Sequence, residues 1–93
     1  MKHTGPLWGI WKIEESSEVL LSLLRNREEY LPQLELIRAE QRRREWLACR
    51  VLLQELTGGP ACIAYRPNGA PYLSGSSLHI SISHTKGYAA VLL

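Results

Sequence analysis

Polar groups that could bind a phosphate gather near the end of the sequence. Residues 81–87 include two serines, an imidazole, a threonine, an ammonium group and a turn glycine. These hydroxyl, imidazole, ammonium and backbone N–H groups all donate hydrogen bonds, which is what an oxyanion requires. The acid nearest to His84 in sequence is Glu55, so a Ser-His-acid triad is not indicated. The segment predicts an anion site, and a purely structural histidine is the alternative.

A second group of cations lies in the middle of the sequence, where Arg42, Arg43 and Arg44 are consecutive. On a helix neighbouring side chains diverge by about 100°, so three consecutive arginines fan over roughly 200° and at most two serve one site. Arg44 follows Glu40 by one helical turn, a spacing that favours a surface ion pair. A solvated helical face is the simpler interpretation of the whole run.

The arginines lie on the most strongly predicted helix, residues 34–56. This stretch holds neither Gly nor Pro, and Thr57-Gly58-Gly59-Pro60 follows it as a stop signal. Its C-terminal half is apolar nearly all round, which predicts a core helix covered on more than one side. A shorter helix is expected to begin at Ser16 or Ser17 and to run through Leu24. Residues 27–33, which contain Pro32, predict a connector or a short turn of helix.

The remaining segments have strand character. We expect strands at residues 7–13, 61–65, 71–73, 78–83 and 88–93. Asn68-Gly69 would form the tip of a hairpin between the second and third of these strands, and residues 84–87 would form another turn. The sequence therefore predicts one α+β domain over residues 1–93. In it, a long core helix and a shorter helix pack on a small, mainly antiparallel sheet.

Composition limits the classes of function. The 93 residues are 45% hydrophobic and 22% charged, with a formal net charge of +2, which suits one small folded domain. So mild a charge argues against a general nucleic-acid surface. Cys49 and Cys62 are expected to be buried thiols in a reducing compartment. The sequence shows no signal peptide and no apolar run of about 18 residues, so we expect a cytoplasmic protein without a membrane helix.

Three segments in order resemble the N-terminal half of Sfp-type 4'-phosphopantetheinyl transferases. They are the arginine-rich helix Arg42-Arg43-Arg44-Glu45-Trp46-Leu47-Ala48-Cys49-Arg50, the turn Gly69-Ala70-Pro71 and the strand end Ile82-Ser83-His84-Thr85. The resemblance runs from about Glu40 to the end of the sequence. It implies one half of a pseudo-two-fold fold.

The resemblance also implies a set of site residues and partners. Ser83 and His84 would hold phosphate groups of coenzyme A, and Arg44 would add positive charge. Where the family has a lysine between the Gly and the Pro, this sequence has Ala70, so Arg66 or Lys86 would replace that contact. The acceptor would be a serine of an apo acyl or peptidyl carrier protein, onto which the phosphopantetheine arm is transferred.

The family's Mg²⁺-binding Gly-[Ile/Val]-Asp-x-Glu motif and its Trp-x-x-Lys-Glu motif are not found in this sequence, which contains no Asp. The resemblance therefore implies that the chain alone transfers no phosphopantetheine and has no catalytic or metal-binding residue of its own. A homodimer that imitates the absent half is expected. A non-catalytic interaction or coenzyme A-binding half-domain is one alternative, and a DNA-binding module is another.

Overall fold

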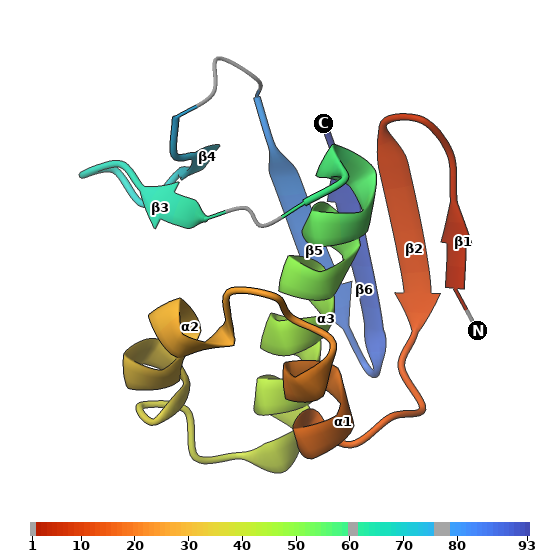
Figure 1. Ribbon diagram of the computed structural model, residues 1–93, viewed down its shortest axis with the longest axis vertical. Coiled ribbons are helices and arrows are strands. Elements are labelled where there is room, and N and C mark those ends of the chain that lie inside the picture. The colour runs from red at the N-terminus through yellow and green to blue at the C-terminus, as the bar shows by residue number, and fades with distance from the viewer. Residues whose placement is uncertain (1, 60–61, 76–78) are drawn as a thin grey trace.

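The computed structural model describes residues 2–59, 62–75 and 79–93. These residues form a four-stranded sheet, a separate two-stranded hairpin and three helices. Figure 1 shows the long helix α3 across one face of the larger sheet, with α1 and α2 beside it. The elements in chain order are β1 (Lys2–Thr4), β2 (Trp8–Lys12), α1 (Ser17–Ser22), α2 (Arg27–Leu34), α3 (Glu40–Thr57), β3 (Ile63–Tyr65), β4 (Pro71–Leu73), β5 (Ser81–Thr85) and β6 (Tyr88–Leu92). The predicted α+β class and small antiparallel sheet are confirmed.

The sheet has the order β1-β2-β6-β5, and every neighbouring pair is antiparallel. Alternation along β2 gives the sheet an inner face toward α3 and an outer face. Gly9 and Trp11 are buried, whereas Trp8 and Ile10 are exposed. A Cβ on Gly9 would lie 2.9 Å from Leu52 Cδ2, so the absence of a side chain there lets α3 pack close to the sheet.

α3 is the core helix that the sequence predicts, and its largest apolar side chains are fully buried. They include Leu47, Val51, Leu52 and Leu53, which is why the helix needs cover on more than one side. Gly58 ends the helix in the left-handed conformation with a φ of 80°, as the stop signal predicts.

The predicted start of this helix at residue 34 is wrong, because α2 ends at Leu34 and α3 begins at Glu40. Tyr30 and Leu34 of α2 are both buried, and Tyr30 meets Trp46 of α3 edge to face at 5.6 Å. A continuous helix could not fold back to make this contact. Packing therefore overrides the helical propensity of the intervening residues.

α1 begins as expected, because the Ser16 hydroxyl caps it by accepting the Val19 N–H. The 27–33 stretch lies within the eight-residue helix α2, Arg27–Leu34, despite Pro32. The thiol predictions are met at Cys49, which is buried, and only in part at Cys62, which is partly exposed. Within residues 2–59, 62–75 and 79–93, no helix combines the length and the apolar composition that crossing a bilayer requires.

The last two strands are joined by a two-residue turn at Lys86 and Gly87, whose φ angles are 43° and 85°. Positive φ at both positions is typical of the tight hairpin turns that match strand twist. This turn lets β5 continue to Thr85, so His84 lies inside the strand and not in the turn as predicted. Leu78, at the predicted start of this strand, is outside the described residues.

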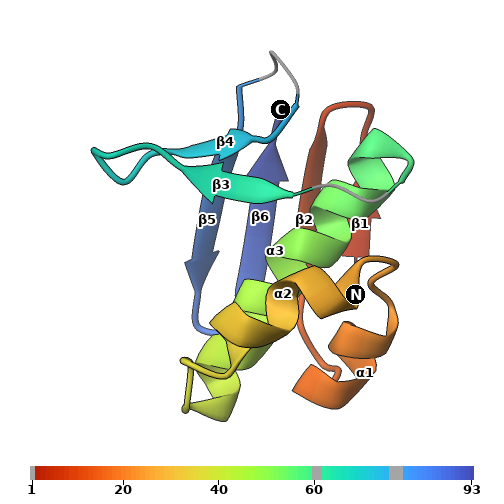
Figure 2. The same ribbon diagram turned by 60° about the vertical axis from the view of Figure 1, so that its left-hand side comes forward.

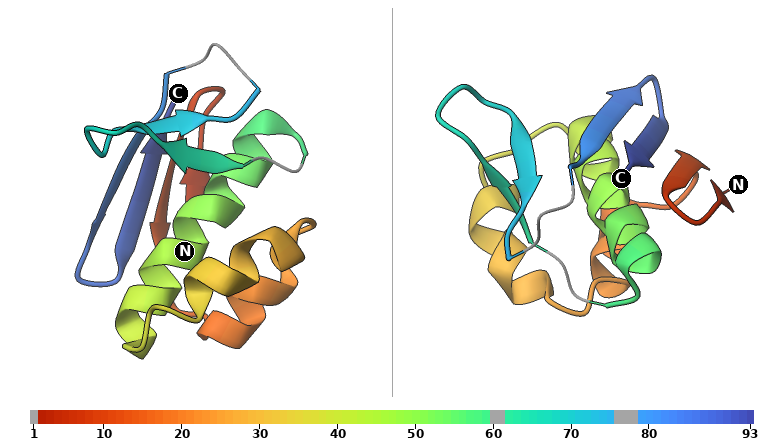
Figure 3. Two further views of the ribbon diagram at one scale, coloured as in Figure 1. Left: turned by 90° about the vertical axis from the view of Figure 1, so that its left-hand side faces the viewer. Right: turned by 90° about the horizontal axis from the view of Figure 1, so that it is seen from above.

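The hairpin of β3 and β4 stands apart from the main sheet, as Figures 2 and 3 show. Its strands pair in the register Ile63↔Leu73 to Tyr65↔Pro71, and Gly69 at the tip has a φ of 89°. This confirms the predicted hairpin over its described part, which leaves out Ala61. The space between this hairpin, α3 and β5 contains the candidate site.

Candidate anion-binding cleft

A cleft of about 480 Å³ opens between α3, the hairpin and the inner face of β5. Nine residues line it: Ile37, Arg42, Trp46, Cys49, Arg50, Tyr65, Pro71, Ile82 and His84. Two arginines and a histidine are among them, and the lining contains no carboxylate. A cavity with this set of donors is suited to an anion.

Arg50 provides the buried positive charge of the cleft, with only 3% of its surface exposed. Its guanidinium carbon lies 3.8 Å from the centre of the Trp46 ring, and its Nη2 donates to the Tyr65 hydroxyl at 2.9 Å. Its Nη1 donates to the Trp46 carbonyl at 3.3 Å, whereas its Nε has no hydrogen-bond partner among the residues that the structure describes. Within the described part of the chain, no carboxylate is within ion-pair distance of this guanidinium. A buried cation without a counter-ion is costly unless an anion joins it.

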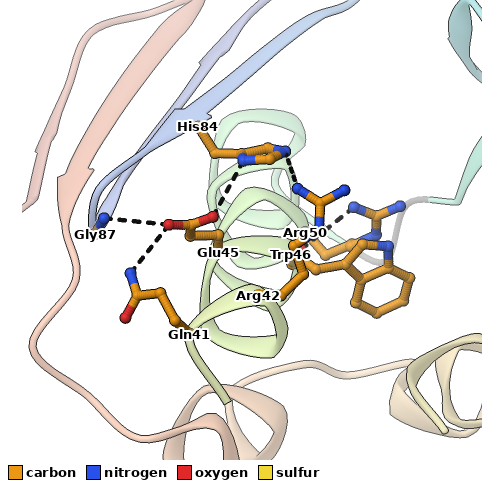
Figure 4. Close-up of polar contacts among 7 residues, drawn as sticks. All are labelled: Gln41, Arg42, Glu45, Trp46, Arg50, His84 and Gly87. Carbon is orange, nitrogen blue, oxygen red and sulfur yellow. Dashed lines mark hydrogen bonds and ion pairs between the residues drawn. The ribbon is translucent and has the colours of Figure 1, made fainter. Parts of the chain in front are cut away.

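His84 lies at the other end of the cleft and is held by an acid that sequence reasoning missed. Its Nδ1 is 3.2 Å from Oε1 of Glu45, a buried residue of α3 (Figure 4). The other carboxylate oxygen of Glu45 accepts hydrogen bonds from Gln41 Nε2 at 3.0 Å and from the Gly87 N–H at 3.2 Å. The bond from Gln41, aided by Gly87 and His84, holds the pKa of Glu45 below its ordinary value despite burial.

Arg42 is the second arginine of the cleft. Its Nη1 lies 3.4 Å from His84 Nε2, so the ring stands between Glu45 and the Arg42 guanidinium, as Figure 4 shows. Arg42 is exposed, and it brings its charge to the open side of the cleft. Arg42, Arg50 and His84 together give three nitrogen-bearing groups around one cavity.

Arg44, the arginine that the resemblance favours, lies elsewhere. Its Nε donates to the Glu15 carbonyl at 2.8 Å and its Nη2 to the Ile13 carbonyl at 3.0 Å. These bonds tie α3 to the segment between β2 and α1, on a different side of the helix from the cleft. The structure therefore does not bring Arg44 together with His84. The expected pairing of Arg44 with Glu40 is also not formed, because Glu40 accepts from the backbone N–H and the hydroxyl of Ser17.

Ser83 and His84 lie on opposite faces of the sheet, contrary to the expectation that both serve one site. The register aligns His84 with Ala89 and Trp11 on the inner face, and it aligns Ser83 with Ala90 and Ile10 on the outer face. Neighbouring residues of a strand must point to opposite sides. The sequence predicted a turn at His84, and a residue in a turn need not follow the alternation of a strand. Because β5 extends past Ser83, the alternation applies and places the two side chains on opposite faces.

The two residues that the resemblance offers in place of a lysine at Ala70 do not line the cleft. Arg66 lies over the Tyr72 ring at 4.8 Å and Lys86 is part of the β5–β6 turn, and neither is among the lining residues. Cys49 does line the cleft, and burial raises the pKa of its thiol to about 11. At neutral pH this thiol stays protonated, so it offers no thiolate nucleophile.

The residues present do not fit a site for Mg²⁺. No group of three or more His, Cys, Asp or Glu side chains that could hold a metal ion occurs among the described residues. Hard cations require several oxygen ligands in a near-octahedral arrangement, and Glu45 is already engaged by three donors. The cleft is suited to an anion and not to a cation.

Comparisons with protein-family models, with curated proteins and with solved structures found no match for this chain.

Proposed function

We propose that this chain binds the phosphate groups of coenzyme A in the cleft of Arg42, Arg50 and His84, as one half of a 4'-phosphopantetheinyl transferase. The observation that supports the proposal most strongly is Arg50, a buried guanidinium without a carboxylate partner in the described structure that faces a cavity rather than the packed core. Charge-assisted contacts to phosphate would compensate it. The order of segments shared with the transferases supplies the choice of coenzyme A.

In this proposal the chain's own residues bind and orient the ligand. Arg50 would contact the most buried phosphate oxygen, and Arg42 would close over the open side of the cleft together with His84. Transfer would also need Mg²⁺ and the carboxylates that hold it, which a second segment or protein would supply. We therefore expect no phosphopantetheine transfer by these 93 residues alone.

The partners in the proposal are an apo acyl or peptidyl carrier protein and a second copy of this chain. The outer face of the sheet has a groove of about 410 Å³ with Trp8, Ile10 and Leu92 in its lining. These three side chains are exposed, and the lining contains no charged residue. In a two-fold dimer this face would pack against the same face of the second copy. Because the face is apolar and uncharged, the contact would bring no like charges together. This favours a second copy as the occupant.

Titration calorimetry tests the ligand. Coenzyme A and dephospho-coenzyme A should both bind, and duplex DNA should not. Arg44 is bonded to a backbone carbonyl and Arg50 is recessed in the cleft, so neither can reach into a DNA groove. His84→Ala should weaken coenzyme A binding about tenfold or more, whereas His79→Ala, an exposed change outside the cleft, should leave it unchanged. Equal losses in both variants, or binding of DNA but not of coenzyme A, would contradict the proposal.

The transfer step has its own assay, the gain of mass on an apo carrier protein. The chain alone should give no labelling. A complementary segment with Asp-x-Glu and Lys-Glu motifs, added in trans, should give Mg²⁺-dependent labelling. Robust labelling by the chain alone would contradict the proposal that the chain binds coenzyme A without catalysing the transfer itself.

A further inference from the structure

In the described part of the chain, each polar contact of the buried Glu45 carboxylate is with a hydrogen-bond donor. Gln41 Nε2 and the Gly87 N–H occupy Oε2, and His84 Nδ1 faces Oε1 (Figure 4). An ionised carboxylate can only accept, so the Nδ1 atom of His84 must carry a hydrogen. The Gly87 carbonyl in turn accepts a hydrogen bond from the Ile13 N–H at 2.8 Å, which ties the β5–β6 turn to the residue after β2.

The arrangement determines which ring atom of His84 faces the cleft. With the hydrogen on Nδ1, the Nε2 atom of a neutral ring is an acceptor, and Arg42 Nη1 at 3.4 Å is placed to donate to it. Among the described residues, the charged or titratable groups around the ring are Arg42 and Glu45 from α3, and Arg50, the Cys49 thiol and the Tyr65 hydroxyl line the same cleft. Its neighbours across the sheet, Ala89 and Trp11, do not titrate.

We propose that Glu45 is a positioning residue that keeps the hydrogen of neutral His84 on Nδ1 and thereby couples anion binding in the cleft to the uptake of one proton at Nε2. The proposal rests on the proposed function, because the anion is the one expected in this cleft. A deprotonated phosphate oxygen can only accept, so it contacts Nε2 favourably only when that atom has gained a proton. The proton comes from solvent, and the imidazolium that forms is stabilised by the carboxylate of Glu45 on one side and the anion on the other.

Glu45→Gln separates this role from simple packing, since the amide has nearly the same shape. Its single oxygen should turn to the side on which Gln41 and Gly87 both donate, and its NH₂ group should face His84. His84 Nδ1 then has to accept, which moves the hydrogen of the neutral ring to Nε2. The variant can donate to an anion without taking up a proton.

Nitrogen NMR of histidine-labelled protein reads the tautomer directly, with His3 and His79 as internal references. At a pH near 8, where an ordinary imidazole is neutral, native His84 should show the hydrogen on Nδ1 and the Glu45→Gln variant should show it on Nε2. The native measurement stands even if the variant does not fold. A native His84 with its hydrogen on Nε2 overturns the proposal, and so does a folded variant with an unchanged tautomer.

Calorimetric titration with coenzyme A, whose phosphate groups are deprotonated at this pH, in two buffers of different ionisation enthalpy, counts the protons. The native protein should take up about one proton per coenzyme A bound and the Glu45→Gln variant about none. Proton uptake near zero in the native protein overturns the coupling. If coenzyme A does not bind while the native tautomer is as stated, the proposed function and the coupling both fail, and only the positioning of the ring by Glu45 is supported.

Discussion

The two sides of α3 carry similar arginines in different surroundings. On one side Arg44 donates to the carbonyls of Ile13 and Glu15, and Glu40 accepts two bonds from Ser17, so these polar groups are engaged by the fold itself. On the other side Arg42 and Arg50 face a cavity and have no carboxylate partner in the described chain. The contrast shows that an arginine-rich helix does not have a single role: one side stabilises the fold, and the other is available for a ligand.

The largest effect on stability is expected from the engaged side. Arg44→Ala should lower the free energy of unfolding by about 2 to 3 kcal/mol, because two backbone carbonyls lose a charged donor. Pyrophosphate binding by the folded fraction should not change, since Arg44 does not line the cleft. Urea unfolding followed by circular dichroism measures the first quantity and calorimetry the second. If Arg44→Ala weakened pyrophosphate binding and left the free energy of unfolding unchanged, the roles assigned to the two sides of α3 would be wrong.

Arg42→Ala, two residues earlier on the helix, should show the opposite pattern. Pyrophosphate binding should weaken about tenfold to a hundredfold through the loss of a charge-assisted contact. Stability should stay within about 0.5 kcal/mol, because the side chain is exposed and, among the described residues, its hydrogen bond is to His84 alone. The same two measurements apply, and Arg44→Ala is the matched control. Binding that is unchanged in Arg42→Ala would remove Arg42 from the site.

Acid should reduce the stability that Glu40 and Glu45, on the two sides of α3, contribute to the fold. The hydrogen bonds from Ser17 lower the pKa of Glu40, and those from Gln41 and Gly87 lower the pKa of Glu45, relative to an ordinary value of 4.5. A group with a lowered pKa in the folded state contributes stability above its unfolded pKa, and this is lost as pH falls through the folded pKa. Stability should therefore decline below about pH 4.5.

Urea titrations between pH 3 and pH 7 measure this decline. It should be shallower in Glu40→Gln and in Glu45→Gln, because each variant removes one of the titrating carboxyl groups. If the free energy of unfolding fell with pH as steeply in both variants as in the native protein, Glu40 and Glu45 would not be the cause of the decline.

The smallest effect on the stability of the folded chain is expected on the outer sheet face. Ile10→Lys places a charge at the centre of the apolar groove, where the side chain is exposed by 47%. The monomer should remain folded, since surface changes away from special features cost little. Sedimentation equilibrium should show the native chain as a dimer and the variant as a monomer. A native monomer at all concentrations would exclude the second copy as the partner of this face.

The elements with strong local signals could be predicted from the sequence. Alternating or β-branched residues predicted the strands around Trp8–Lys12 and Tyr88–Leu92, and the glycines predicted the helix end at Gly58 and the hairpin tip at Gly69. β1 has no such signal, because all three of its residues are exposed and it forms only by pairing with β2. The break between α2 and α3 depends on burying Tyr30, a contact that local propensity does not encode.

The candidate site was predicted only in part. His84 was identified from its residue type, but its partner Glu45 lies 39 positions earlier, on an element that only the tertiary fold brings near. The helical fan correctly predicted that the consecutive arginines would diverge, yet it could not say which of them would face His84. One signal was available: Arg42, Trp46 and Cys49 are spaced by four and three residues, and together with Arg50 they mark one face of the helix.

The measurement that tests the cleft most directly is made on Arg50→Met, with calorimetry of pyrophosphate binding beside urea unfolding. Methionine replaces the buried charge with an apolar chain of similar length, and such replacements are often neutral or stabilising. The cleft assignment predicts that the free energy of unfolding stays within about 1 kcal/mol of the native value or rises, while pyrophosphate binding weakens at least about tenfold. A variant that binds pyrophosphate as tightly as the native protein does would contradict the central claim that Arg50 is the buried charge of an anion site.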